Sequence, residues 1–332
     1  MSAKPIGEIL IDSLKKQREI TMKSVWTVGE LIMEIMRPHA EMPHGIPAEY
    51  LGPYPSGAPG IMISSAARMG ADAYVVGCVG KDAFGDLLAD RLTSQGVHGN
   101  YLFRSARKST GVAFVMYHED GEREFIYHID GSAATDFTMP EDFEIEEGSI
   151  LHLMGCTLTV SPQFCKGIVD FAMKFIAKGG KISFDPNLRP ELLKDGDLSA
   201  IIKPIIDNCS ILLPGVGELL LISGKNSVED AVTQMFKNSK LEIIGLKNGA
   251  KGCRIITRDG VWEAGAYKVE QKDPTGAGDS FDGAFLAGIT QGKDMTEAAR
   301  WANAAGALDA AAFGPMEGDI SIESVNKLIN QC

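Results

Sequence analysis

The residues best suited to chemistry lie in one short segment, Gly276, Ala277, Gly278 and Asp279. The glycines allow a tight turn, and apolar residues at helical spacing follow as far as Ile289, which predicts a glycine-rich loop that opens a helix. Free backbone N–H groups and the positive end of the helix dipole would form an anion site there. The carboxylate in the first turn would be ionised and ready to accept a proton. An anion site beside a base is what a kinase needs, although the same residues in isolation are more typical of a plain turn and a helix cap.

Length, charge and cysteine content narrow the class of protein. The chain has 332 residues, which suits one α/β domain or two modest ones. Its net charge of −12 argues against nucleic acids and anionic membranes as partners. The cysteines form no C-x-x-C pair and indicate buried thiols in a reducing compartment. The sequence shows neither a signal-peptide layout nor an apolar run of the ~18 residues that a membrane helix needs, so we predict a cytoplasmic protein.

Strands and helices alternate along most of the chain, which predicts a Rossmann-like, doubly wound α/β fold with a mostly parallel sheet. The expected strands are 25–36, 73–79, 149–154, 181–185, 210–213, 242–246 and 252–257. Two helices should end near residues 69 and 96, and others should cover 161–178, 197–207, 228–237, 279–289, 295–312 and 321–330. Residues 1–22 carry apolar residues at helical spacing and predict an N-terminal extension with a surface helix.

Two segments interrupt the alternation and predict a small β-sheet lid. Residues 100–130 contain two alternating strands, 111–118 and 122–129, joined by a hairpin signal. Residues 37–56 are rich in proline, which indicates loops or edge strands.

Six motifs, in family order, resemble those of the ribokinase-like (PfkB) carbohydrate kinases. They are T-V-G-E from Thr27, S-G-A-P-G from Ser56, G-C-V-G-K-D-A-F-G-D from Gly77, D-P-N-L-R-P from Asp185, L-K-N-G-A-K-G from Leu246 and D-P-T-G-A-G-D-S-F from Asp273. The last is the most specific, and the resemblance covers nearly the whole chain. It implies a single ribokinase-like kinase domain at 23–332, with the lid formed by about 37–56 and 100–130.

The resemblance also implies a role for each matched residue. Asp279 would take the proton of the attacking sugar hydroxyl, while the backbone of the anion loop holds the charge that develops on the phosphoryl group. The sugar would also contact Glu34, Gly57 and Arg189. Residues facing ATP would be Asn187, Glu218, Lys247, Gly249, Gly252 and Asn303, with Glu218 reaching Mg²⁺ through water and Asp273 and Thr275 holding a monovalent cation such as K⁺. Plain structural roles remain open for Asn187, Glu218 and Asn303, and an exposed strand end remains open for Glu34.

Departures from the family pattern bear on the substrate. Ile129 stands where relatives acting on 2-keto-3-deoxygluconate carry an arginine for the sugar carboxylate, so a neutral sugar is predicted, with a ketohexose favoured. Arg123 or Arg189 could replace that arginine, which keeps a 2-keto-3-deoxygluconate kinase as the alternative. Ile61 replaces a sugar-binding asparagine and weakens a ribokinase assignment, and only Glu218 remains of an N-x-x-E motif.

Other functional classes fit less well. A sugar or nucleotide sensor that lost activity would not need the intact G-A-G-D segment. A dinucleotide oxidoreductase lacks a G-x-G-x-x-G after its first strand, and a P-loop NTPase would need G-x-x-x-x-G-K-[ST].

The hairpin also predicts assembly. Val112, Phe114 and Met116 alternate with Ala113, Val115 and Tyr117, so both faces of the lid are apolar. A lid that covers its own cleft leaves the other face bare, which predicts a homodimer through the lid. The alternative is that residues 37–56 or the N-terminal helix cover the outer face of the same chain.

Overall fold

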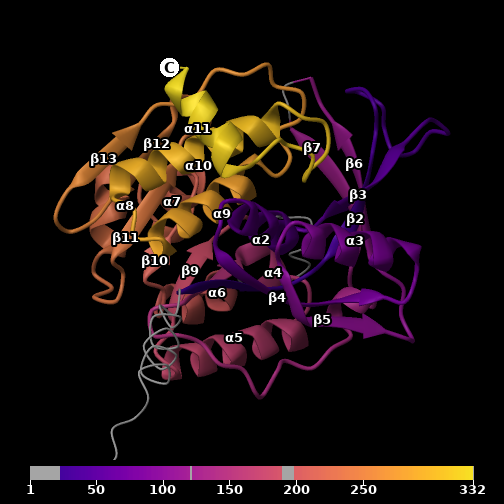
Figure 1. The fold of residues 1–332 in the computed structure, drawn as a ribbon, viewed down its shortest axis with the longest axis horizontal. Helices are drawn as coiled ribbons and strands as arrows, with labels where there is room; N and C mark the ends of the chain where they lie inside the picture. Colours follow the sequence, from indigo (N-terminus) through magenta and orange to yellow (C-terminus); the bar gives the residue numbers. More distant parts are fainter. Residues whose placement is uncertain (1–22, 120–121, 189–197, 332) are drawn as a thin grey trace, which may run out of the picture.

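The main sheet of the protein positions every element of the site. The computed structural model describes residues 23–119, 122–188 and 198–331. The sheet has the strand order β13-β12-β11-β10-β9-β8-β1-β4-β5 (Figure 1), and its neighbours from β11 to β5 run parallel, which confirms the predicted fold class. Its strands are β1 (Ser24–Val28), β4 (Asp72–Gly80), β5 (His98–Ser105), β8 (Ile150–Met154), β9 (Lys181–Asp185), β10 (Ile211–Leu212), β11 (Ile243–Lys247), β12 (Cys253–Ile256) and β13 (Val261–Ala264). Only β5 and β13 were not predicted as strands.

Helices cover both faces of this sheet. One core lies beneath α4 (Gly155–Leu158), α5 (Pro162–Ala177), α6 (Leu198–Ile206), α7 (Val216–Ser223) and α8 (Val228–Met235). The other lies beneath α2 (Ala58–Arg68), α3 (Ala83–Ser94), α9 (Ala277–Thr290) and α10 (Met295–Ala310), and α11 (Ile322–Asn330) packs on α10. In Figure 1, α5 lies at the bottom of the view and α10 and α11 near the top. None of the helices in the described ranges is long and apolar enough to cross a membrane.

A second, four-stranded sheet forms the lid, in the order β3-β2-β6-β7. Its strands are β2 (Ile32–Met36), β3 (Leu51–Ser56), β6 (Gly111–Tyr117) and β7 (Arg123–His128). The sheet stands apart from the main one at the upper right of Figure 1. The edge strand β3 lies in the proline-rich segment 37–56, as expected. The expected start of the lid near residue 100 is wrong, because β5 pairs in parallel with β4 at the edge of the main sheet.

The single strand predicted at 25–36 is also wrong. The chain leaves the main sheet after β1 and enters the lid at β2, so the apolar run spans two sheets. The break falls at Gly29, where a Cβ would come within 2.5 Å of the Pro59 side chain, so the two elements can approach only because this residue is glycine. An unbroken apolar pattern carries no sign of such a change of sheet.

The outer face of the lid is partly covered by the same chain. Tyr50 packs edge-on against Phe114, with ring centroids 5.4 Å apart, and its ring also lies under the buried Arg37 guanidinium. Met116 is 3% exposed, whereas Ile126 is 41% exposed. The prediction of a bare outer face is therefore wrong for Phe114 and Met116, and the predicted alternative, cover by residues 37–56, is confirmed at Phe114. The helix predicted within residues 1–22 lies outside the described residues.

Candidate active site

A cavity of about 190 Å³ lies between the lid and the ends of the main-sheet strands. Residues that end or follow strands line its floor, among them Glu30, Asp185 and Lys247, because the carboxyl ends of parallel strands share one edge of the sheet. Its remaining lining is Ile32, Glu34, Gly57, Ala58, Ile61, Arg123, Phe125, Tyr127, Ile129, Cys156, Asn187, Glu218, Pro274, Thr275, Gly276, Gly278 and Asp279. The cavity thus gathers residues from five of the six sequence motifs, and none from the motif that begins at Gly77.

The loop before α9 has the conformation that an anion site requires. Gly276 is the residue before the helix and adopts φ 87°, a left-handed conformation that glycine tolerates best. A Cβ there would lie 2.6 Å from the carbonyl oxygen of Pro315, so no other residue fits. No side chain caps the helix. The N–H of Ala277 donates to the carbonyl oxygen of Pro274 at 3.3 Å and that of Ser280 to Gly276 at 2.7 Å, so the N–H groups of Gly278 and Asp279 are the ones in the first turn best placed to bind an anion.

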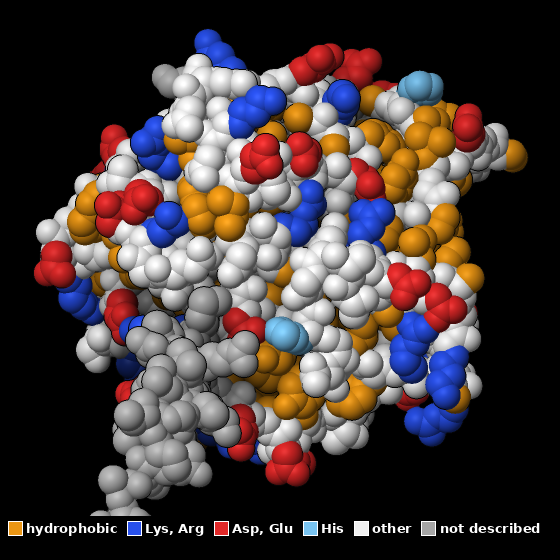
Figure 2. Space-filling model, viewed as in Figure 1, with side chains coloured by type: hydrophobic (Ala, Val, Ile, Leu, Met, Phe, Trp, Pro, Cys, Tyr) orange, Lys and Arg blue, Asp and Glu red, His pale blue; other side chains and the backbone are white. Residues whose placement is uncertain are grey.

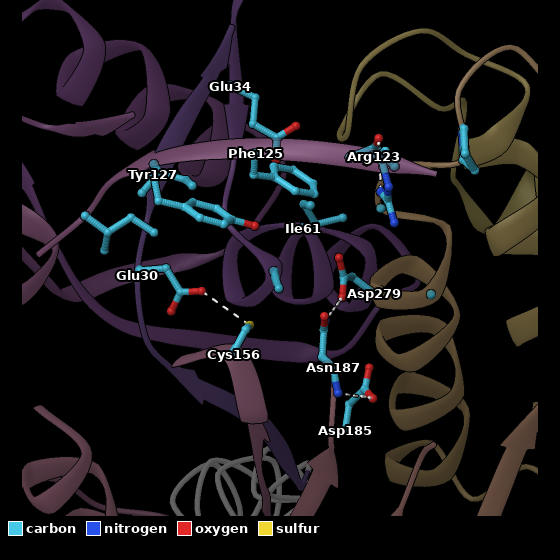
Figure 3. Close-up of a pocket in the computed structure, with 18 of the residues that line it drawn as sticks. Glu30, Glu34, Ile61, Arg123, Phe125, Tyr127, Cys156, Asp185, Asn187 and Asp279 are labelled. Carbon is cyan, nitrogen blue, oxygen red and sulfur yellow. Dashed lines mark hydrogen bonds between the residues drawn. The ribbon is translucent and has the colours of Figure 1, made fainter. Parts of the chain in front are cut away.

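Asp279 stands in the first turn of α9 and is held by a neighbouring amide. Its Oδ1 accepts a 2.9 Å hydrogen bond from Nδ2 of Asn187, and the carboxylate is 8% exposed. Asn187 itself adopts φ 36°, and its backbone N–H donates to Oδ1 of Asp185 at 3.1 Å. Figure 3 shows these three residues in one line below the cavity. A residue of the D-P-N motif therefore helps to orient the base.

A largely buried cation lies close to the anion loop. Nζ of Lys247 is 2.7 Å from Asp185 and 3.1 Å from Asp282, and it lies 3.7 Å from the position of a Cβ on Gly278. Burial favours the neutral amine, but Asp185 and Asp282 outweigh it and raise the pKa of Lys247. Burial also raises the pKa of Asp282, whereas Lys247 brings the pKa of Asp185 below its usual value against the effect of burial. The ion pair is thus Lys247 with Asp185.

Two glutamates mark the other end of the cavity. Glu34 accepts a 2.6 Å hydrogen bond from the Ser56 hydroxyl, and the Cys156 thiol lies 3.5 Å from Oε1 of Glu30. Both carboxylates are buried, at 6% and 3% exposure. Gly57 has φ 96°, and a Cβ added to it would lie 2.4 Å from the carbonyl oxygen of Glu30. Sequence reasoning selected Glu34 and missed Glu30, although T-V-G-E contains it.

The lid contributes a wall of larger side chains. Arg123, Phe125 and Tyr127 alternate along β7 and line the cavity, while the residues between them are exposed (Figure 3). Ile32, Ile61 and Ile129 add to the apolar part of the lining. The two-residue period of 122–129 was visible in the sequence, but nothing in it told which face would point inward.

Residues predicted to face the nucleotide fall into two groups. Glu218 lines the cavity, but its carboxylate accepts from the backbone N–H groups of Gly215 at 2.8 Å and Leu188 at 3.0 Å, and burial raises its pKa. Gly249, Gly252 and Asn303 lie outside the cavity lining. Asn303 donates from Nδ2 to the carbonyl oxygens of Ala264 at 2.9 Å and Gly265 at 3.1 Å, a structural role that sequence reasoning had left open.

The outer side of the anion loop is rich in buried carboxyl groups. Asp273 is 1% exposed and accepts from the Thr275 N–H at 2.9 Å, the Tyr117 hydroxyl at 3.0 Å and the Gly314 N–H at 3.0 Å. Asp309, which sequence reasoning missed, is also 1% exposed, and neither of its oxygens has a hydrogen-bond partner among the residues that the structure describes. Burial first, and then Asp279, raise the pKa of Asp309 to about 9. An excess of buried carboxyl groups fits a bound monovalent cation.

A divalent metal would depend on the substrates. No group of three or more His, Cys, Asp or Glu side chains in the described residues could hold a metal ion. Mg²⁺ keeps most of its water and is commonly held by one or two carboxylates and substrate phosphates, so Glu218 and Asp185 at the cavity floor fit that mode. Arg189, predicted to bind the sugar, lies outside the described residues.

Uncapped helix N–H groups, an adjacent fixed carboxylate and a buried lysine define a phosphotransferase site. The comparisons agree. The family model described as pfkB family carbohydrate kinase matches residues 22–321. The chain is 34% identical over 271 residues to fructokinase-1 of Oryza sativa subsp. japonica, covering 78% of this chain and 83% of that protein. The chain therefore belongs to the pfkB family and is a carbohydrate kinase that phosphorylates an alcohol group.

Solved structures give the same result. An E. coli protein described as a ribokinase II, in complex with ATP and Mg²⁺, superposes with a TM-score of 0.85 at 32% identity, covering 94% of this chain and 100% of that one. A fructokinase double mutant from Vibrio cholerae, with fructose, ADP and potassium ion bound, superposes with a TM-score of 0.82 at 25% identity, covering 92% and 98%.

Proposed function

We propose that this kinase transfers the γ-phosphoryl group of ATP to a hydroxyl of a neutral sugar, a ketohexose such as fructose. The observation that carries the proposal is the pairing of the anion loop with two buried glutamates at opposite ends of one cavity. Carboxylates accept hydrogen bonds from sugar hydroxyls and repel a sugar carboxylate. The apolar Ile129 and the similarity to fructokinases support the same substrate class.

The geometry assigns steps to this chain's residues. Glu30 and Glu34 would hold sugar hydroxyls and turn the reacting hydroxyl toward Asp279. Asp279, fixed by Asn187, would take its proton as the hydroxyl oxygen attacks phosphorus. The N–H groups at the start of α9, with Lys247 behind them, would hold the charge that develops on the phosphoryl oxygens. Bound Mg²⁺ would neutralise charge on the nucleotide phosphates.

A substrate panel tests this proposal. The full chain is mixed with Mg²⁺–ATP and single sugars, and ADP release is measured. We expect fructose or another neutral ketohexose to give the highest kcat/KM. A best rate with 2-keto-3-deoxygluconate would overturn the neutral-sugar proposal, and ATP binding without turnover on any sugar would favour a sensor.

We also propose a homodimer through the lid. The strand β7 is the end strand of its sheet, Ile126 on its outer face is 41% exposed, and hydrophobic side chains gather over the lid at the upper right of Figure 2. Self-cover by Tyr50 leaves less apolar surface than the sequence predicted. Light scattering at micromolar concentration decides the matter, and a fully active monomer would contradict the dimeric lid.

A further inference from the structure

The inner face of β7 runs from one end of the cavity to the other. Arg123, Phe125 and Tyr127 share this face because strand side chains alternate. Four residues of strand span about 13 Å, so Arg123 and Tyr127 mark opposite ends. Figure 3 shows Tyr127 on the side of Glu30, whereas Arg123 lies above the start of α9 on the side of Asp279. The arginine is therefore at the end where phosphoryl transfer takes place.

Contacts with the anion loop hold Arg123 in this place. Its Nη1 donates to Oγ1 of Thr275 at 3.2 Å, and Thr275 immediately precedes Gly276. Tyr117 pairs with Arg123 across the hairpin, and its hydroxyl lies 3.2 Å from the same threonine oxygen and 3.0 Å from Oδ1 of Asp273. The free end of the lid hairpin is thus joined to the anion loop through two neighbouring side chains.

The charge of Arg123 is not matched by the protein around it. Among the residues that the structure describes, Arg123 and Lys247 are the basic side chains that line the cavity, and Lys247 is already paired with Asp185. Arg123 has no ion pair within 4.0 Å among the residues the structure describes, and Thr275 takes a single one of its donors. A guanidinium carries five N–H donors in a planar fork that matches phosphate oxygens. An unmatched arginine over an anion loop is a site for an incoming oxyanion.

We propose that Arg123 is a catalytic residue that donates hydrogen bonds to the phosphoryl group during its transfer. The inference rests on the proposed function. In the step, the bond from the γ-phosphorus to the bridging oxygen of ADP breaks as the bond to the sugar oxygen forms. The hydroxyl proton passes to Asp279, and Arg123 stays protonated throughout. The positive charge of Arg123 lies on the lid side of the transferred phosphoryl group, opposite the N–H groups at the start of α9. The phosphoryl group is therefore stabilised from both of these sides.

The alternative source of an oxyanion is an acidic substituent on the sugar itself. Such a group would have to lie beside Thr275, where the transferred phosphoryl group passes, so two anions would compete for one place. Glu30 and Glu34 line the rest of the sugar end and repel a carboxylate. The position of Arg123 therefore favours the phosphoryl group and also weakens the case for a sugar acid.

Kinetics of Arg123→Met and Arg123→Lys test the proposal, with Arg107→Met as the matched control, because the Arg107 side chain is 83% exposed and outside the cavity. We expect Arg123→Met to lower kcat on fructose by about 10²–10³-fold, while the KM for fructose changes less than about threefold. Arg123→Lys should lose less, and added guanidinium should partly restore Arg123→Met. Binding of the complex of ADP, aluminium fluoride, Mg²⁺ and fructose should weaken by a similar factor, and thermal melting should match the wild type.

Three results would overturn the proposal. One is an unchanged kcat in Arg123→Met. Another is a rise in the fructose KM at constant kcat, which would make Arg123 a sugar-binding residue. The third is a loss at least tenfold greater on 2-keto-3-deoxygluconate than on fructose, which would assign Arg123 to a substrate carboxylate. A wild-type protein that phosphorylates no sugar would instead contradict the proposed function, so the two failures are distinguishable.

Discussion

The floor and the roof of the cavity are built by different rules. The floor consists of strand ends and the first turn of α9, whose side chains are fixed by buried contacts such as Asn187 to Asp279. The roof is the inner face of β7, the end strand of a small sheet, with half-buried side chains. The floor depends mainly on backbone geometry, so it can be predicted from the glycines and turn residues of the sequence. Side-chain choice dominates the roof, where Arg123 serves the proposed phosphoryl transfer and Phe125 and Tyr127 can alter substrate preference without altering the floor.

Removing the base on the floor should give the largest effect. Asp279→Asn keeps the shape of the side chain and loses the proton acceptor, so we expect kcat to fall about 10²–10⁴-fold with nucleotide binding almost unchanged. Steady-state kinetics and titration with ADP measure the two quantities. The exposed Asp259→Asn serves as the control. Near-normal turnover would show that the floor does not supply the base.

Changing the sugar end should affect binding more than chemistry. Glu34→Gln keeps the contact with Ser56 within reach but removes the charge that would accept sugar hydroxyls. Hydrogen bonds to charged groups contribute about 1.5–3 kcal/mol, so the fructose KM should rise roughly 10–100-fold. The control is Glu124→Gln, on the exposed face of β7. An unchanged KM would remove Glu34 from the sugar site.

Exchanging K⁺ for a large organic cation tests the outer side of the anion loop. The buried Asp273 and Asp309 carboxyl groups favour a bound cation there, and its loss should distort the loop. We expect activity to fall several-fold and the melting temperature to drop, with both restored by K⁺. If neither quantity responds after thorough removal of K⁺, the carboxyl groups do not form a cation site.

The smallest effect concerns stability in acid. Burial lowers the pKa of His152 to about 3, below an ordinary value near 6.5. A depressed pKa means that the unfolded chain binds the proton first, so stability present above pH 6.5 is lost as pH falls toward 3. His152 contributes a slope of up to about 1.4 kcal/mol per pH unit to the free energy of unfolding. Urea unfolding at pH 7, 6, 5 and 4 should show a shallower loss in His152→Gln, and parallel curves would contradict it.

The sequence predicted features that depend on backbone pattern. The parallel sheet, the loop before α9 and the hairpin of β6 and β7 all follow from periodicity and glycine placement. The path from β1 to β2 could not be predicted, because the apolar run continues across the change of sheet. The burial of Asp309 could not be predicted either, because a single aspartate near the end of an alanine-rich helix gives no sign that it is buried. Arg123 was visible only as a substitute for an absent arginine, because its role depends on which face of β7 turns inward.

The parallel pairing of β2 with β6 has a consequence for how the protein acquires activity as it folds. Ile32 pairs with Gly111, and residues 37–110 lie between the two strands, including β4, β5 and their helices. Closing so long a loop has an entropic cost that local contacts must first offset, so this pairing should form late. The β6–β7 hairpin that carries the roof is local, but it is placed over the cavity only through β6. A chain that is still folding can therefore form the strand ends and the first turn of α9 before β7 takes its place over the cavity. Full recognition of the sugar arises only when β2 has paired with β6.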